Sequence, residues 1–166
     1  MKNILFVCTG NTCRSSMAEG LLKTALLADQ EMNNKYTVSS AGISAYDGDQ
    51  ASFNSIMAMK ENWGIDISTH SARMLNENDV KSAHLILTMT RAHKKSVLAR
   101  FPNAKDKVYT LKEYVNEYKT DPDLESYNFA LDILDPYGMP YEVYKKCSME
   151  INEAVEKLVD KLRNEK

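Results

Sequence analysis

The chain has 166 residues, of which 43% are hydrophobic and 27% are charged, with a formal net charge of −2 at pH 7. This length and apolar content predict one globular domain over residues 1–166, and we expect a monomer. The balanced charges argue against a nucleic-acid partner. The N-terminal apolar run is too short for a signal peptide or a membrane span, so we expect no membrane partner.

The predicted elements alternate between strands and helices along the chain. Strands are expected at residues 4–8, 36–40, 84–89 and 107–111, and helices at 16–29, 51–63, 76–81, 91–101 and 141–163. Residues 31–35 are interpreted as a polar link, 43–50 as an exposed loop and 113–129 as a long acidic surface loop. This alternation predicts an α/β fold with a single doubly wound, four-stranded parallel sheet and helices on both faces.

A polar loop follows the first strand, beyond the carboxyl end where ligands of such sheets bind. It consists of Cys8-Thr9-Gly10-Asn11-Thr12-Cys13-Arg14-Ser15, and the next helix is expected to begin at Ser15 or Ser16. The backbone N–H groups of a loop that leads into a helix N-terminus can point at an anion. We therefore predict that residues Thr9 to Ser15 bind a phosphate group.

The spacing of Cys8 and Arg14 adds a nucleophile to this anion site. A helix N-terminus and a guanidinium both stabilise a thiolate, so Cys8 is expected to titrate below its ordinary pKa. Arg14 can contact two oxygens of a tetrahedral anion at once. Gly10 is expected to relieve crowding, Asn11 to occupy a left-handed turn position, and Ser15 to donate a hydrogen bond to the sulfur.

These motifs together resemble the low-molecular-weight protein phosphatase family. The resemblance rests on Cys8–Ser15, Met17-Ala18-Glu19, Ser39-Ser40-Ala41-Gly42, Thr69-His70-Ser71-Ala72-Arg73 and Asp135-Pro136-Tyr137. It implies the strand order 2-1-3-4, and it implies that His70 braces Asn11 and Ser40 beside the loop. The family has Pro where this chain has Ser16, and the run from Ser16 to Glu19 predicts a capping box instead.

Transfer of a phosphoryl group to a thiolate requires a proton donor for the leaving group, and the same group can later activate water. Two Asp-Pro pairs compete for this role, Asp121-Pro122 and Asp135-Pro136. Asp135 follows apolar residues, so a more buried and stiffer setting with a raised pKa is expected for it. The resemblance places the general acid at Asp135, and Asp132 is a weaker alternative.

The other candidate ligands and nucleophiles have more modest predicted roles. Cys13 is a candidate redox partner of Cys8, whereas Cys147 is expected to pack in a helix. His84 and His93 are expected to be structural or exposed. No spacing resembles a set of metal ligands, so neither a metal nor another cofactor is expected. Three unevenly spaced cysteines favour a reducing, cytoplasmic setting.

The expected substrates are phosphorylated proteins, with inorganic phosphate as the product. Thr12 and Tyr137, the latter followed by Gly138, resemble the bacterial branch of the family that hydrolyses phosphoarginine. A hydroxyl at residue 12 can accept bonds from a guanidinium, whereas an aliphatic side chain would pack on a phenyl ring. The alternatives are a low-molecular-weight tyrosine phosphatase, an arsenate reductase and a non-catalytic phosphoprotein-binding module. The reductase is disfavoured because residues 76–95 contain no further cysteine pair.

Overall fold

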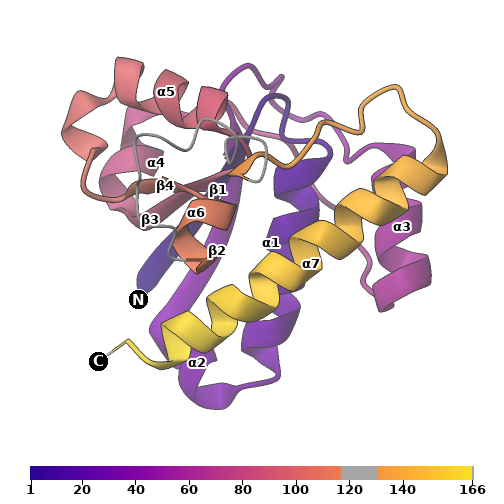
Figure 1. The fold of residues 1–166 in the computed structure, drawn as a ribbon, viewed down its shortest axis with the longest axis horizontal. Helices are drawn as coiled ribbons and strands as arrows, with labels where there is room; N and C mark the ends of the chain where they lie inside the picture. Colours follow the sequence, from indigo (N-terminus) through magenta and orange to yellow (C-terminus); the bar gives the residue numbers. More distant parts are fainter. Residues whose placement is uncertain (117–130, 166) are drawn as a thin grey trace.

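The computed structural model of the chain describes residues 1–116 and 131–165 (Figure 1). Four parallel strands form one sheet in the order β2-β1-β3-β4. The strands are β1 (Lys2–Cys8), β2 (Tyr36–Gly42), β3 (Ala83–Thr88) and β4 (Val108–Thr110). This arrangement confirms the predicted doubly wound α/β sheet and its strand order.

Helices precede, connect and follow these strands along the described chain. They are α1 (Arg14–Leu27), α2 (Gln30–Lys35), α3 (Phe53–Trp63), α4 (Glu77–Ser82), α5 (Arg91–Arg100), the 3-10 turn η1 (Pro102–Ala104), α6 (Leu111–Asn116) and α7 (Tyr141–Arg163). The predicted stop after the second long helix is confirmed, because Gly64 ends α3 in the left-handed region with φ 64°. None of the helices within residues 1–116 and 131–165 is long and apolar enough to cross a membrane.

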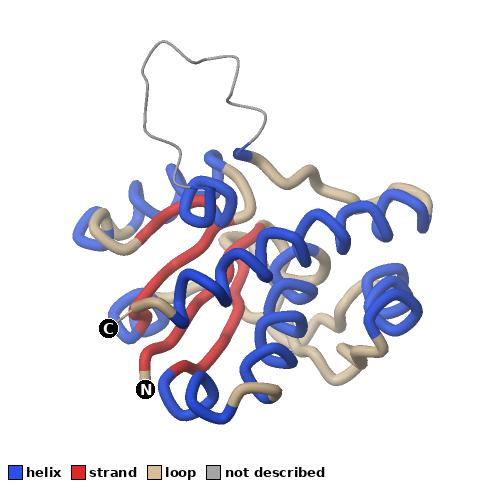
Figure 2. The backbone as a smooth tube through the Cα atoms, turned by 60° about the horizontal axis from the view of Figure 1, so that its bottom comes forward, coloured by secondary structure: helices blue, strands red, loops and turns tan. Residues whose placement is uncertain are grey.

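The two faces of the sheet bury different sets of apolar side chains. Alternate residues of β1 point to opposite sides, as the two-residue period of a strand requires. Ile4 and Phe6 pack into the larger cluster with residues of α1 and α7, whereas Leu5 and Val7 pack with residues of α4 and α5. Figures 1 and 2 show α1 and α7 beside each other on one face of the sheet. Both faces are therefore covered, as predicted.

Two short helices replace segments that were interpreted as a link and a loop. The predicted polar link at 31–35 is wrong, because the Asp29 carboxylate caps α2 at the Met32 N–H and Met32 is buried. The predicted fourth strand extends too far, because α6 begins at Leu111. There the Thr110 hydroxyl and the Glu113 carboxylate each accept a backbone N–H of the other residue. The remainder of the predicted 113–129 loop, from residue 117, lies outside the described residues.

The start of α1 also differs from the prediction. The helix begins at Arg14, and its N-cap Cys13 makes no side-chain capping hydrogen bond. The capping box predicted for Ser16 and Glu19 is wrong, because the Ser16 hydroxyl donates to the Cys13 carbonyl at 2.8 Å and the Glu19 carboxylate binds other side chains. The N-cap side chain therefore leaves the first turn of α1 uncapped at the loop that follows β1.

Candidate active site

The loop between β1 and α1 lies in a cleft of about 340 Å³ at the carboxyl end of the sheet. The cleft is lined by loop residues that include Cys8 and Arg14, and by Ser44, Tyr46, Asp49, Asp135 and Tyr137. Asn11 has φ 57° and is the non-glycine residue with positive φ within the described part of the chain. Its predicted left-handed turn is confirmed, and the loop folds back on the sulfur of Cys8 at this residue.

The hydrogen bonds of Asn11 fix the direction of the donors around the sulfur. The backbone N–H of Arg73 donates to Asn11 Oδ1 at 3.0 Å, so the other end of the amide must be the nitrogen. Asn11 Nδ2 then donates to Ser15 Oγ at 2.8 Å. Because that oxygen already accepts, the Ser15 hydroxyl is free to donate to Cys8 Sγ, also 2.8 Å away. The predicted contact between Ser15 and the sulfur is present.

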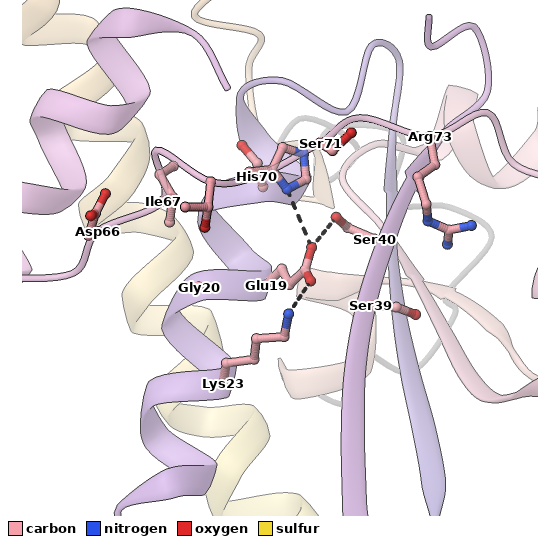
Figure 3. Close-up of a pocket in the computed structure, with 12 residues that line it drawn as sticks. Glu19, Gly20, Lys23, Ser39, Ser40, Asp66, Ile67, His70, Ser71 and Arg73 are labelled. Atoms are coloured by element: carbon pink, nitrogen blue, oxygen red, sulfur yellow. Dashed lines mark hydrogen bonds and ion pairs between the residues drawn. The ribbon is translucent and has the colours of Figure 1, made fainter. Parts of the chain in front are cut away.

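Figure 3 shows a neighbouring pocket in which Ser40, Glu19 and His70 point toward one another. Asn11 Nδ2 also donates to Ser40 Oγ at 2.8 Å, and the Ser40 hydroxyl donates to Glu19 Oε2. His70 Nε2 lies 2.6 Å from the Asn11 carbonyl, which can only accept, so this nitrogen carries the proton. His70 Nδ1 lies 3.7 Å from Glu19 Oε2. The implied bracing by Ser40 and His70 is therefore present in the geometry, and Glu19 joins the two.

The Cys8 thiol is almost fully enclosed, with 2% of its surface exposed. Burial raises the pKa of this thiol above its ordinary value. Hydrogen bonds from Ser15, the positive charge of Arg14 and the Asn11 N–H act in the opposite direction without reversing the rise. The predicted low pKa is therefore wrong for the protein in this structure, because the closely folded loop removes the sulfur from water.

Arg14 is buried beneath the cleft and has one unused donor. Its Nη1 donates to the Ile133 carbonyl at 2.9 Å, and its Nη2 lies 3.4 Å from Asp135 Oδ2. The buried Nε of Arg14 has no hydrogen-bond partner among residues 1–116 and 131–165. A buried donor without a partner costs free energy, which an anion in the loop would recover. This arrangement suits a phosphate oxygen.

Asp135 faces the cleft but is more exposed than expected. Its carboxyl group is 49% exposed, so the prediction of a buried setting is wrong. The predicted stiffness has a structural basis, because Asp135 Oδ1 accepts the Tyr137 N–H at 3.1 Å across Pro136. The weaker alternative, Asp132, accepts the Arg91 N–H at 2.8 Å and pairs with the Arg91 side chain. Asp121 lies outside the described residues.

The remaining predicted loop residues line the cleft or support it. Thr12 and Tyr137 both line the cleft, and Tyr137 is 75% exposed. Gly10 has an open environment, since an added Cβ would come no closer than 3.7 Å to any surrounding atom. Cys13 Sγ lies 3.4 Å from Ser52 Oγ and 3.8 Å from the Tyr144 hydroxyl, and all three cysteines are free thiols. Cys147 is buried in α7, as expected.

His93 contacts the site although it was expected to be structural or exposed. It is 5% exposed, and its Nε2 lies 2.8 Å from the Thr9 hydroxyl. Burial lowers the pKa of His93 to about 4, and the charge of Arg14 acts in the same direction. His93 is therefore neutral near pH 7. His84, by contrast, is exposed near Glu165 at the opposite end of β3.

Sequence reasoning missed several residues at the site, namely Glu19, Ser44, Tyr46, Asp49 and His93. Glu19 was interpreted as part of a family motif and of a capping box but was given no role at the site, although an acid within the buried stretch of a helix indicates a polar partner. Tyr46 and Asp49 were assigned to an exposed loop, and both are exposed, but that loop forms one wall of the cleft. An exposed aromatic residue in a loop was the available signal.

Comparison with known proteins supports this geometry. Residues 3–166 match the family described as low molecular weight phosphotyrosine protein phosphatase. A protein-arginine-phosphatase of Geobacillus stearothermophilus is 41% identical over 98% of this chain and 97% of the relative. The solved structure of the YwlE arginine phosphatase from that organism has a TM-score of 0.83 and 38% identity, covering 98% of this chain and 94% of its own. A solved structure of a low molecular weight protein tyrosine phosphatase from T. tengcongensis has a TM-score of 0.82 and 40% identity, covering 97% of this chain and 99% of its own.

Proposed function

Because this chain belongs to the low molecular weight phosphotyrosine protein phosphatase family, we propose that it uses Cys8 to hydrolyse phosphoarginine in proteins. The observation that carries the proposal is the arrangement in one cleft of three groups. These are the Cys8 thiol, the buried Arg14 whose Nε has no partner among the described residues, and the Asp135 carboxyl group paired with Arg14. Together they provide a nucleophile, an anion clamp and a proton carrier.

In the first step Cys8 gives its thiol proton to water, and the resulting thiolate attacks phosphorus, so that an S–P bond forms as the P–N bond to the guanidino group breaks. The Ser15 hydroxyl and the Asn11 N–H stabilise the charge on the sulfur. Arg14 and the backbone N–H groups of residues 9–15 bind the phosphoryl oxygens. Asp135 transfers its proton to the guanidino nitrogen, which keeps the electron pair of the broken P–N bond, and arginine leaves with that nitrogen as an NH2 group.

In the second step water cleaves the phosphocysteine. Asp135 is now a carboxylate and takes a proton from the attacking water. The water oxygen bonds to phosphorus, the S–P bond breaks, and the electron pair returns to the sulfur of Cys8. Inorganic phosphate leaves, and Asp135 again carries the proton for the next cycle. The half-exposed position of Asp135 suits this role, because water must reach it.

The assignment of phosphoarginine draws on Thr12 and on the similar proteins. Thr12 lines the cleft, where its hydroxyl can accept hydrogen bonds from a guanidino group. The protein of Geobacillus stearothermophilus that is 41% identical over nearly the whole chain is named a protein-arginine-phosphatase. Tyr137 forms part of the same wall and contributes contact area for the substrate side chain.

The test is the kcat/KM of the enzyme on peptides that differ only in carrying phosphoarginine or phosphotyrosine. We expect a preference for phosphoarginine that is abolished in Cys8→Ser. Replacing Thr12 with Ile should shift the preference toward phosphotyrosine. A preference of the wild-type enzyme for phosphotyrosine would keep the mechanism but refute the substrate.

A protein tyrosine phosphatase is the second candidate function. The exposed rings of Tyr46 and Tyr137 line the cleft and could pack on either face of a phenyl phosphate. The similar structure from T. tengcongensis is named a tyrosine phosphatase. The peptide comparison above distinguishes this candidate from the first.

We also propose that the chain acts as a monomeric, single-domain enzyme in the cytoplasm, on phosphorylated proteins and without a nucleic-acid or membrane partner. The three free cysteines support a reducing compartment. The elements from β1 to α7 pack on one shared sheet, which supports a single domain. Sedimentation of the full chain at assay concentration tests the oligomeric state.

A further inference from the structure

The cleft contains a second carboxylate that the proposed mechanism does not use. Asp49 lines the cleft together with Asp135, from the loop that connects β2 to α3. Asp135 is paired with Arg14 at 3.4 Å. The Asp49 side chain makes no hydrogen bond or ion pair with any residue that the structure describes. It therefore places an uncompensated negative charge at a site that binds phosphate esters or amides.

The turn that carries Asp49 is held rigidly. It spans residues 46–49, is closed by the Asp49 N–H donating to the Tyr46 carbonyl at 3.2 Å, and has Gly48 at φ 92°. The Gly48 N–H donates to the Ala72 carbonyl at 2.9 Å, and the Asp49 carbonyl accepts the Ala72 N–H at 2.8 Å. Asp49 is therefore fixed by backbone bonds on both sides, with its side chain left to the cleft.

The turn is also tied to the phosphate-binding loop. The Ser44 N–H, just before the turn, donates to the Thr9 carbonyl at 3.0 Å. Asp47 Oδ1 accepts the Met74 N–H at 2.7 Å, which anchors the outer side of the turn. The hydrogen bond between Ser44 and Thr9 joins the segment that carries Asp49 to the phosphate-binding loop. It therefore sets the position of Asp49 relative to a phosphoryl group bound in the loop.

A free carboxylate discriminates between leaving groups. The phenyl ring of phosphotyrosine offers the carboxylate no hydrogen-bond donor, and the phosphoryl group is common to both substrates, so only the leaving group distinguishes them. The guanidino group of phosphoarginine carries N–H donors in a planar arrangement that matches a carboxylate. The rings of Tyr46 and Tyr137 can pack on either substrate, so they do not select between them.

We propose that Asp49 is a specificity-determining residue that binds the guanidino N–H groups of the phosphoarginine side chain. This inference rests on the proposed function and extends it, because it assigns the selection of the leaving group to a carboxylate outside the phosphate-binding loop. Asp135 remains the proton donor, and Asp49 takes no part in proton transfer.

The test compares Asp49→Asn with wild type on the matched phosphoarginine and phosphotyrosine peptides. We expect kcat/KM for phosphoarginine to fall about fivefold, mainly through KM, because an exposed charge-assisted contact contributes to substrate and transition state alike. The value for phosphotyrosine should stay unchanged or rise. Asp47→Asn is the matched control, because it removes a charge from the same turn while its Oδ1 can still accept the Met74 N–H.

The outcomes separate the two proposals. An enzyme that prefers phosphoarginine, but in which Asp49→Asn changes both substrates equally or neither, refutes the role of Asp49 alone. An equal loss of phosphoarginine activity in Asp47→Asn would also refute it, because the loss would then follow from the removal of any negative charge in the turn. A wild-type preference for phosphotyrosine would refute the proposed function, and the role of Asp49 with it. Thermal unfolding of both variants checks that the turn is intact.

Discussion

A single methyl group added at Gly42 should reduce catalysis, although Gly42 does not line the cleft. Gly42 ends β2 directly opposite Cys8. An added Cβ would lie 2.4 Å from the Thr9 carbonyl oxygen and 3.0 Å from the Asn11 nitrogen. An ordinary C···O contact is about 3.3 Å, so one of the two backbones must move by about 0.9 Å.

The phosphate-binding loop must move, because the end of β2 is held in place. The Gly42 N–H donates to the Arg73 carbonyl and its carbonyl accepts the Leu75 N–H, both at 2.9 Å, so the strand end is held in place. A shift of about 1 Å in groups that bind the reacting atoms costs about 100-fold in rate. We therefore expect Gly42→Ala to lower kcat about 100-fold and to lower the free energy of unfolding by about 1–3 kcal/mol.

The assay measures kcat on the phosphoarginine peptide together with thermal unfolding of the same samples. Gly20→Ala is the matched control, because its Cβ would meet a side-chain methyl group, Ile67 Cγ2, at 2.8 Å instead of the backbone of the loop. Any adjustment therefore falls on core side chains, and alanine favours the helix by about 1 kcal/mol, so kcat should change little. A folded Gly42→Ala enzyme with a kcat within about twofold of wild type would refute the idea that this contact sets the loop.

Three further predictions follow from the same structure. Asn11→Ala should lower the free energy of unfolding by about 2–4 kcal/mol and reduce kcat, because it removes hydrogen bonds to Ser15, Ser40 and Arg73 while the backbone keeps its positive φ. An unchanged midpoint of denaturant unfolding would contradict this. Burial raises the pKa of Glu165, but hydrogen bonds from Tyr114 and Tyr36 and the charges of Lys2 and His84 leave it below its ordinary value. A carboxyl group with a lowered folded-state pKa stabilises the protein above its unfolded pKa and loses that contribution as the pH falls, so Glu165→Gln should flatten the fall in melting temperature on acidification below about pH 5. Peroxide should produce a disulfide between Cys8 and Cys13, which mass spectrometry would detect. The contacts of Cys13 with Ser52 and Tyr144 must break as the disulfide forms. Recovery of sulfinic Cys8 alone would contradict this prediction.

The sequence predicted most of the fold because its strands and long helices carry strong periodic patterns. The strand from Ile4 to Cys8 is continuously apolar, and the structure buries Ile4 to Val7 completely. Six residues give too few turns for a helical period to emerge, and of the three six-residue helices α4 was predicted whereas α2 and α6 were missed. Their starts are set by caps at Asp29 and Thr110, which are local hydrogen bonds that composition does not reveal.

The candidate site was predicted where its residues are adjacent in sequence and missed where they meet only through the fold. Cys8, Arg14 and Ser15 belong to one loop, so their proximity follows from their spacing. Asp49 lines the cleft and His93 contacts Thr9 of the loop, each from a separate connection of the sheet, and no pattern in the chain links them to Cys8. The direction of the pKa shift of Cys8 was predicted wrongly for a related reason, because the burial of the sulfur depends on how tightly the loop closes.

The conformation of the loop is itself a product of distant segments. A non-glycine residue in the left-handed region costs about 1 kcal/mol or more, so Asn11 requires compensation. The Arg73 N–H, the Ser40 hydroxyl and His70 supply it, and all three come from segments beyond α1. Because these groups act on Asn11 before any substrate arrives, the donors of the loop are already oriented for an anion, and little reorganisation is needed during the reaction. The Cys-x5-Arg spacing therefore brings the reactive groups together, while the fold around Asn11 orients them.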